Sequence, residues 1–182
     1  CIRDSSGSMN SATGSVSVIS SNSNTSVNTA LALNANITAA NDAIFSVSGS
    51  QASMVMNTAA SARTIEAGRN IGITSAYDLI LGGTLNAVTG ITIAANDDVT
   101  IPASLTAGAG NLSIQTVSGD INLGSATKVG SASATQGLAS LQTGTGNIYI
   151  GHAGKASTIT ANNSRLTTGA GGIKILGNVS SN

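Results

Sequence analysis

The chain has 182 residues, of which 8% are charged and 2% are aromatic, and its formal net charge is 0. Its seven Lys and Arg residues are scattered singly, so they offer no basic surface to neutralise phosphates, which excludes nucleic acid as a partner. No stretch approaches the roughly 20 apolar residues of a membrane-spanning helix. The apolar residues are mostly Ala, Ile, Leu and Val, which indicates a thin, layered core.

The first part of the chain alternates between apolar and polar residues only in short pieces. Residues 1–28 are rich in Ser and Asn, and we expect them to form an irregular N-terminal segment. Alternating pieces follow at residues 30–33, 43–47 and 54–56, and they predict strands with uneven spacing. Helix is disfavoured almost everywhere, because Val, Ile and Thr fill the periodic positions and Gly recurs often.

Residues 67–123 contain the most regular turns of a repeat. Its unit is a small polar residue, an aliphatic residue, any residue and a second aliphatic residue. Six copies form two interleaved series with members 20 to 22 residues apart: Asn70-Ile71-Gly72-Ile73, Gly90-Ile91-Thr92-Ile93 and Asn111-Leu112-Ser113-Ile114; then Asp78-Leu79-Ile80-Leu81, Asp98-Val99-Thr100-Ile101 and Asp120-Ile121-Asn122-Leu123. A fixed period in this range is typical of a winding repeat architecture.

The repeat predicts an all-β fold, a parallel β-helix (β-solenoid) with two strands and about 20–25 residues in each turn. The two aliphatic residues of a copy share one face, so stacked turns should form four aliphatic columns. One column is predicted to contain Ile71, Ile91 and Leu112. An array of antiparallel hairpins is the competing interpretation, but it requires shorter turns than the gaps seen here.

The regular spacing ends after residue 123. Residues 124–146 are expected to be a loop-rich insertion, and the repeat returns at residues 147–150 and 172–175. Residues 1–182 are therefore interpreted as a single β-solenoid domain. We expect the Gly-x-Gly segments that precede several copies to supply the backbone angles of sharp corners. No capping helix is evident at either terminus, so we expect either a longer rod or ends that stack on further copies.

The segment Ala67-Gly68-Arg69-Asn70-Ile71-Gly72-Ile73, followed by Asp78-Leu79-Ile80-Leu81-Gly82-Gly83, carries a resemblance to a known family. Residues 67–123, and less clearly residues 143–175, resemble the repeat region of bacterial filamentous-haemagglutinin-type exoproteins. The resemblance implies a right-handed parallel β-helix, export across the outer membrane and display as a surface fibre or adhesin.

Few residues suggest chemistry. Asp78, Asp98 and Asp120 occupy equivalent places in successive turns, so they could hold a cation such as Ca²⁺ or be solvated turn residues that bond backbone amides. We favour the second interpretation. His152 lies in a Gly-rich turn without a placed partner. Cys1 is compatible with the start of a fragment, a lipid anchor or an intermolecular disulfide. No catalytic, cofactor-binding or metal-binding residue is predicted.

The sequence thus favours a non-enzymatic structural protein. We expect a subunit or segment of an extracellular bacterial fibre or adhesin, located outside the cell or on its surface. Its expected partners are further copies in a head-to-tail filament, with contacts to a cell surface or to glycans left open. A carbohydrate-binding or polysaccharide-cleaving β-helix would need clustered acids or aromatic residues. An ice-binding solenoid would need a regular Thr row, which Gly72 and Ser113 interrupt.

Overall fold

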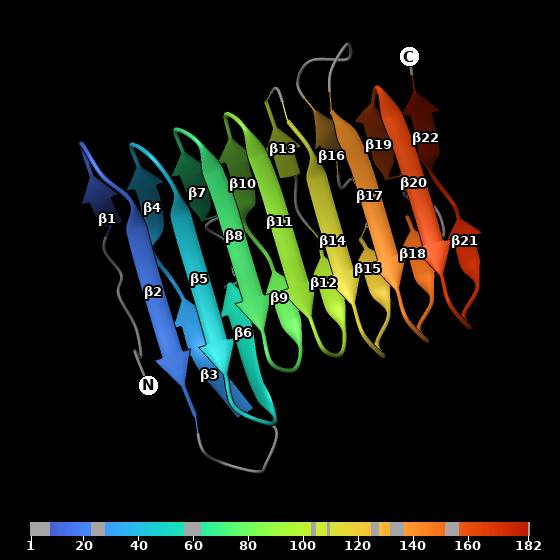
Figure 1. Ribbon diagram of the computed structural model, residues 1–182, viewed down its shortest axis with the longest axis horizontal. Coiled ribbons are helices and arrows are strands. Elements are labelled where there is room, and N and C mark those ends of the chain that lie inside the picture. The colour runs from blue at the N-terminus through green and yellow to red at the C-terminus, as the bar shows by residue number, and fades with distance from the viewer. Residues whose placement is uncertain are drawn as a thin grey trace.

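The computed structural model describes residues 8–22, 28–56, 63–102, 105–108, 110–124, 128–131, 137–151 and 157–181. Across these ranges the chain forms 22 strands in three parallel sheets, here called sheets I, II and III (Figure 1). The same ranges contain no helix, and therefore none that is long and apolar enough to cross a membrane.

Each sheet collects every third strand of the chain. Sheet I consists of β1 (Ser8–Ser11), β4 (Asn36–Ala39), β7 (Thr64–Ala67), β10 (Thr84–Ala87), β13 (Leu105–Ala107), β16 (Lys128–Ser131), β19 (Thr158–Ala161) and β22 (Asn178–Ser181). Sheet II consists of β2 (Val16–Ser21), β5 (Ala43–Ser48), β8 (Asn70–Ser75), β11 (Gly90–Ala95), β14 (Leu112–Thr116), β17 (Leu138–Thr143) and β20 (Asn163–Thr168). Sheet III consists of β3 (Asn28–Leu33), β6 (Ala52–Met56), β9 (Leu79–Leu81), β12 (Val99–Ile101), β15 (Ile121–Leu123), β18 (Ile148–Ile150) and β21 (Ile173–Ile175).

The chain winds as a right-handed coil. It runs down the near sheet, sheet II, and returns up the two far sheets while it advances from β1 at one end to β22 at the other (Figure 1). This is the sense that parallel crossover connections almost always take. The eight strands of sheet I, spaced roughly 4.8 Å apart, give a coil about 34 Å long. The predicted parallel β-helix is therefore confirmed, including its handedness.

The register of the strands confirms the predicted aliphatic columns. Ile91 pairs with Ile71 on one side and with Leu112 on the other, and every paired strand is parallel. In sheet III, Val99 pairs with Leu79 and with Ile121. Like side chains thus stack on like in successive coils, and β-branched residues pack well on such a pleated surface.

The number of residues in each turn varies along the coil. Paired residues are 20 apart between Ile65 and Leu85, whereas Val129 and Ile159 are 30 apart. The regular turns and several others have the expected 20–25 residues, and the longer ones have additional residues between their strands. The strands on either side of these additional residues keep their register with the neighbouring coils.

The prediction of two strands in each turn is wrong, because sheet I supplies a third. Five of its strands carry an aliphatic residue and an Ala two positions later, as in Leu85-Asn86-Ala87, which pairs with β7 and β13, while β1, β16 and β22 have Ser at the second position. Only one large side chain per strand points inward, so the pattern is weaker than the paired aliphatic residues of the other two sheets. The columns of Leu85 and Ala87 close the third side of a triangular core.

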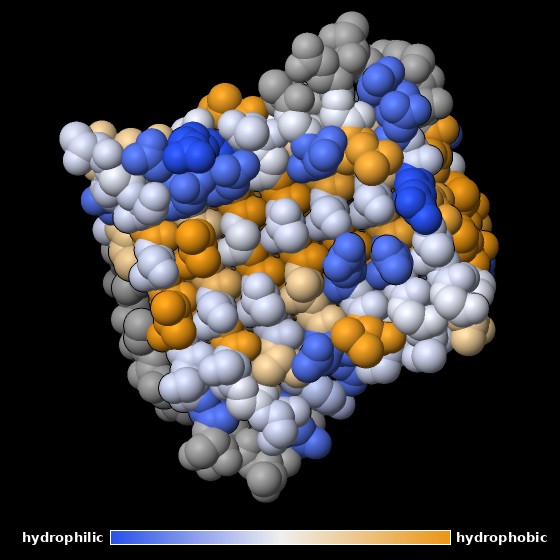
Figure 2. Space-filling model, in the orientation of Figure 1, coloured by the Kyte–Doolittle hydropathy of each residue, from blue (hydrophilic) through white to orange (hydrophobic). Residues whose placement is uncertain are grey.

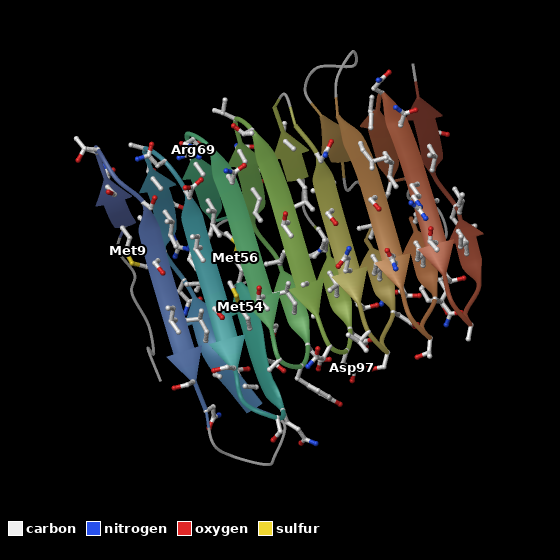
Figure 3. All side chains as sticks on the ribbon, viewed as in Figure 1. Met9, Met54, Met56, Arg69 and Asp97 are labelled. Atoms are coloured by element: carbon white, nitrogen blue, oxygen red, sulfur yellow. The ribbon has the colours of Figure 1, made fainter. Side chains whose placement is uncertain are left out.

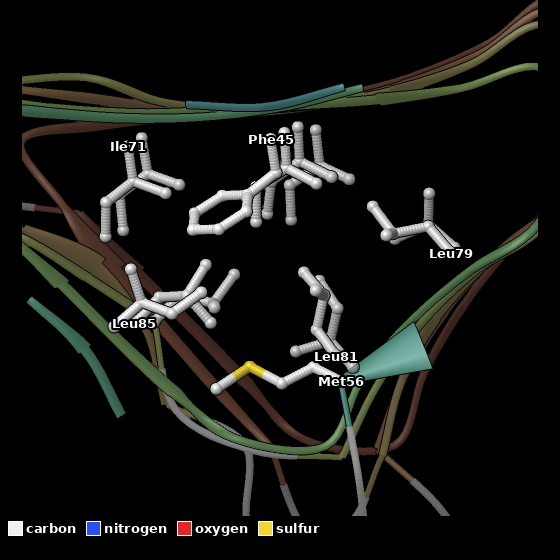
Figure 4. Close-up of a cluster of buried hydrophobic side chains, with 14 of the residues drawn as sticks. Phe45, Met56, Ile71, Leu79, Leu81 and Leu85 are labelled. Atoms are coloured by element: carbon white, nitrogen blue, oxygen red, sulfur yellow. The ribbon is translucent and has the colours of Figure 1, made fainter. Parts of the chain in front are cut away.

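Side chains of the regular strands alternate between the core and the surface. Along β11 the inward residues Ile91, Ile93 and Ala95 are buried, while Thr92 is exposed. On the face of sheet II seen in Figure 2, pale residues are interspersed with orange, hydrophobic ones and a few blue, hydrophilic ones. Met54 and Met56 of β6 point into the coil (Figure 3), and aliphatic side chains from all three sheets meet inside it (Figure 4). Each buried aliphatic residue contributes roughly 1.5–3 kcal/mol.

Strands are also present in the two segments that were expected to be irregular or loop-rich. β1 and β2 lie within residues 1–28, and their strands pair with β4 and β5. Within residues 124–146, β16 pairs with β13, and β17 pairs with β14. The low aliphatic content of these segments hides them from pattern analysis, but their register matches that of their neighbours.

The glycines at the corners act through close approach rather than through unusual backbone angles. Among the described glycines, Gly49, Gly137 and Gly151 have positive φ. None of these three belongs to a Gly-x-Gly segment that precedes a copy of the repeat. A Cβ atom on Gly110 would overlap the carbonyl oxygen of Thr89 in the preceding coil. The expectation about corner angles is corrected accordingly: glycine is needed because stacked corners leave no room for a side chain.

Candidate functional site

The three aspartates singled out in the sequence lie one above another at the corner between sheets II and III. The backbone N–H of Asp98 donates to Oδ1 of Asp78 (3.3 Å), and that of Asp120 donates to Oδ1 of Asp98 (2.7 Å). Asn147 continues the column, because its N–H donates to Oδ1 of Asp120 (2.6 Å). The interpretation as turn residues that bond backbone amides is confirmed.

The pKa values of two groups are raised at this acidic corner. Burial raises the pKa of Asp78, and the hydrogen bond from the backbone of Asp98 offsets part of that shift. A hydrogen bond to Asp97, together with the charge of that carboxylate, raises the pKa of the Tyr77 hydroxyl. In the part of the chain that the structure describes, no group of three or more His, Cys, Asp or Glu residues is placed to hold a metal ion.

A column of buried hydroxyl groups lies just inside the same corner. Thr116 Oγ1 donates to the carbonyl oxygen of Gly119 (2.6 Å), and Thr143 Oγ1 donates to that of Gly146 (2.6 Å). Ser75 and Thr168 make the same contact three residues onward in their own coils. Ala95 occupies the equivalent position between Ser75 and Thr116 and carries no hydroxyl. These hydroxyl groups stabilise the turn between sheets II and III, so their role is structural.

The opposite corner, between sheets I and II, carries a mixed column of acid and amide side chains. Asp42, Asn70, Gly90 and Asn111 occupy equivalent positions in four successive coils. Asp42 Oδ1 accepts hydrogen bonds from Asn70 N (3.1 Å) and Asn70 Nδ2 (3.0 Å). Arg69 Nη1 lies 3.9 Å from Asp42 Oδ2, and its side chain is exposed at the upper edge of sheet II (Figure 3).

Asn111, the fourth residue of this column, connects it to the next coil. Asn111 Oδ1 accepts the backbone N–H of Leu138 (2.9 Å), which begins the next strand of sheet II. Gly90 has no side chain, so it leaves a gap in the column between the two asparagines. The corner is therefore polar but nearly balanced in charge, unlike the acidic corner.

A shallow groove opens on the outer face of sheet II beside this gap. Its volume is about 600 Å³, and its lining includes Asp42, Ile44, Asn70, Gly72, Thr92 and Asn111. Gly72 lies between Ile44 and Thr92 in one outward row of the sheet. Sequence reasoning treated Gly72 only as an interruption of a Thr row. A glycine in the middle of a regular strand was the available signal.

A second hollow lies on the outer face of sheet III. Its volume is about 420 Å³, and Asn122, Tyr149 and Lys174 follow one another along its floor. Leu176, with 46% of its surface exposed, lines its edge. The described lining contains one aromatic ring and one cation, and it brings together none of the residues that the sequence singled out.

The coil formed by β20, β21 and β22 exposes aliphatic side chains whose partners in the preceding coil are buried. Ile173 and Ile175 are 43% and 46% exposed, although their partners Ile148 and Ile150 are fully buried. Val179 is 37% exposed, whereas its partner Ile159 is buried. Each of these three strands is hydrogen-bonded on one side within the described structure. This aliphatic surface is called here the β20–β22 end face.

Cys1 and His152 lie outside the residues that the structure describes, so their predicted roles remain predictions. Comparison with protein-family models, with curated proteins and with solved structures finds no match to this chain. The class that the geometry defines is a right-handed parallel β-solenoid repeat region.

Proposed function

We propose that this chain is a non-enzymatic structural segment of an extracellular bacterial fibre or adhesin, of the filamentous-haemagglutinin type. The chief support is the stacking of aliphatic columns through three parallel sheets. Such a coil resists bending and proteolysis, because each strand inside it is bonded to both neighbours. The Ala-Gly-x-Asn-Ile-x-Ile and Asp-Leu-x-Leu-Gly-Gly sequences support the family assignment.

The disposition of the acidic groups supports a role without catalysis. Each aspartate of the acidic corner already accepts a backbone amide from the next coil. Asp97, which is the other acid of this corner, is hydrogen-bonded to Tyr77. These carboxylates hold successive coils in register, and a pair arranged across a substrate bond is a different geometry.

The β20–β22 end face is, in this proposal, covered by the β1–β3 coil of another copy. Following the columns across such a joint places Val179 over Met9, and Leu166 over Val18. It places the exposed pair of β21 over Leu31 and Leu33, which belong to the same two columns. Leu31 and Leu33 are themselves buried within the β1–β3 coil, so the joint forms chiefly because three parallel sheet edges gain partners. A head-to-tail contact of this kind builds a filament when it does not close into a ring.

Assembly as a function of concentration tests the proposal. The parent chain is expected to form filaments visible by electron microscopy, with a mass by light scattering that rises with concentration. Ile173→Lys combined with Ile175→Lys places two charges in the joint and should raise the concentration needed for assembly roughly tenfold or more. Both positions are already exposed, so the fold should survive.

Val88→Lys combined with Val117→Lys is the matched control. These residues are 60% and 63% exposed at corners of the coil, away from the end face, so assembly should be unchanged. A parent chain that stays monomeric at its highest soluble concentration would overturn head-to-tail assembly. The same holds for a Lys double variant at β21 that assembles like its parent.

A further inference from the structure

Gly72 has no steric reason to be glycine. It lies in the middle of β8, and a Cβ atom built on it would meet no heavy atom within 4 Å. Its φ does not lie in the left-handed region that favours glycine. Many other described glycines differ, because a Cβ atom on them would collide with the backbone of a neighbouring coil.

This glycine weakens the strand that contains it. Glycine in a strand interior loses more conformational entropy on folding than other residues and costs roughly 0.5–1 kcal/mol relative to Ala. The equivalent outward residues of the adjacent coils are Ile44 and Thr92, both of which favour strands. A glycine in a strand interior often marks a bulge, a tight bend or a place where a ligand or another backbone approaches closely. β8 pairs with both neighbours without a bulge at Gly72, which favours a close approach.

Gly72 forms the floor of the 600 Å³ groove on sheet II. Ile44, with 45% of its surface exposed, provides an apolar wall on one side, and Thr92 provides a hydroxyl on the other. Asp42, Asn70 and Asn111 form a polar rim along the corner. Since Gly90 carries no side chain, the rim is open between Asn70 and Asn111. The groove follows the axis of the coil and crosses successive strands.

The groove's position restricts the kind of ligand it can take. β8 is hydrogen-bonded to β5 and to β11, so no backbone edge is available here for a peptide to add as a strand. The cation at the rim, Arg69, is already paired with Asp42, so the corner offers little attraction to a polyanion. A ligand must therefore pair with carboxylate, amide and hydroxyl groups and also pack on Ile44 and on the bare strand.

We propose that this groove binds a neutral oligosaccharide or polysaccharide chain that lies along the axis of the coil. It would do so through Asp42, two amide side chains, a hydroxyl group and Ile44, and not through the clustered acids or aromatic residues that the sequence analysis required of a carbohydrate-binding β-helix. Sugar hydroxyl groups suit the rim, because each can both donate to carboxylate and amide oxygens and accept from amide N–H groups. The C–H faces of the sugar rings suit Ile44 and the floor at Gly72. Successive coils repeat every 4.8 Å or so, close to the length of one sugar unit in an extended chain. This inference does not depend on head-to-tail assembly.

A substitution at Gly72 separates binding from folding. Gly72→Val places a side chain in the groove where the parent has none. Because Val favours strands, the variant should melt at the same temperature as the parent or above it. Retention on an array of neutral and acidic oligosaccharides identifies the probe, and calorimetric titration with the strongest neutral oligosaccharide then measures affinity. We expect Gly72→Val to weaken this affinity roughly tenfold or more, and Gly72→Ala to weaken it less.

Ala94→Val is the matched control, since Ala94 is an outward residue of neighbouring β11 that does not line this groove. It should leave glycan affinity unchanged while adding a similar β-branched side chain to the same sheet. The proposal is overturned if the array retains no neutral glycan, if acidic glycans alone bind, or if folded Gly72→Val binds as tightly as the parent.

Discussion

At the scale of single residues, the acidic corner shows that either a carboxylate or an amide oxygen can accept the backbone N–H of the next coil. Asp120 Oδ1 accepts the N–H of Asn147, and Asn147 Oδ1 in turn accepts the N–H of Gly172 (2.8 Å). The acceptor role needs an oxygen but no charge. Where aspartates stack, repulsion between them opposes the hydrogen bonds that they make.

Replacing Asp78 by asparagine should therefore stabilise the protein at neutral pH. Asp78→Asn keeps the oxygen that accepts the N–H of Asp98 and removes a partly buried charge next to Asp97 and Asp98. Because the folded-state pKa of Asp78 is raised, its contribution to stability is greatest below the unfolded pKa and is lost as pH rises through the folded value. We expect a gain of at most about 1 kcal/mol at pH 7 that disappears in acid.

Thermal unfolding of parent and variant across a pH series measures this difference. Asp42→Asn is a suitable control, because Asp42 faces Arg69 and its charge is balanced there. That substitution should bring no gain at pH 7. Equal melting temperatures for Asp78→Asn and its parent at neutral pH, or a gain that persists in acid, would contradict the account of this corner.

At the scale of strands, the buried hydroxyl column predicts a second stabilising change. Ala95 lies between Ser75 and Thr116, whose hydroxyls each donate to the carbonyl oxygen three residues onward. Thr at position 95 should donate to the carbonyl oxygen of Asp98 in the same way. Ala95→Val has nearly the same shape without the hydroxyl, so comparison of the two variants isolates the hydrogen bond.

We expect Ala95→Thr to be more stable than Ala95→Val by roughly 1 kcal/mol in chemical denaturation. The corner already accommodates Thr in the next three coils of this column, which argues that the added methyl group fits. A Val variant as stable as the Thr variant would show that the hydroxyl column does not fasten the corner.

The strands also show where sequence reasoning succeeds and where it stops. Sheets II and III were predictable, because each of their regular strands carries two aliphatic residues two positions apart. Sheet I was missed, because its strands combine one apolar residue with Ala, as in Leu105-Thr106-Ala107, or with Ser, and these small residues contribute little to a hydrophobic pattern. The weak signal reflects geometry, since small residues fill the narrow corner of a triangular core.

The candidate site was less predictable than the fold. The acidic column was found from the period alone, and its bonding to backbone amides was the favoured expectation. The groove at Gly72 was not found, because the chain has 22 glycines and sequence cannot separate those that stacking requires from one that it does not. That distinction depends on atoms of Ile44, Thr92 and other residues in adjacent coils, which only three-dimensional packing brings together.

At the scale of the whole molecule, every inference depends on coils that lie in register. The filament joint extends the aliphatic columns beyond the β20–β22 end face, and the groove uses residues of four successive coils. The coil itself is a sum of neighbour contacts, in which no single turn buries its own core. Long insertions are tolerated because they leave the stacked strands unchanged, so sequence can drift at corners while the columns persist.

The most direct test of this register is a distance measured between spin labels on one outward row of sheet II. Ile19 and Gln142 lie on that row, five strand spacings apart through Ser46, Thr74, Ala94 and Gln115. Labels at Ile19→Cys and Gln142→Cys, in a chain carrying Cys1→Ser and diluted with unlabelled protein, should give a narrow distribution near 24 Å, or about five times 4.8 Å. A broad distribution, or a mean distance far above this value, would contradict the stacked coil and the proposals that rest on it.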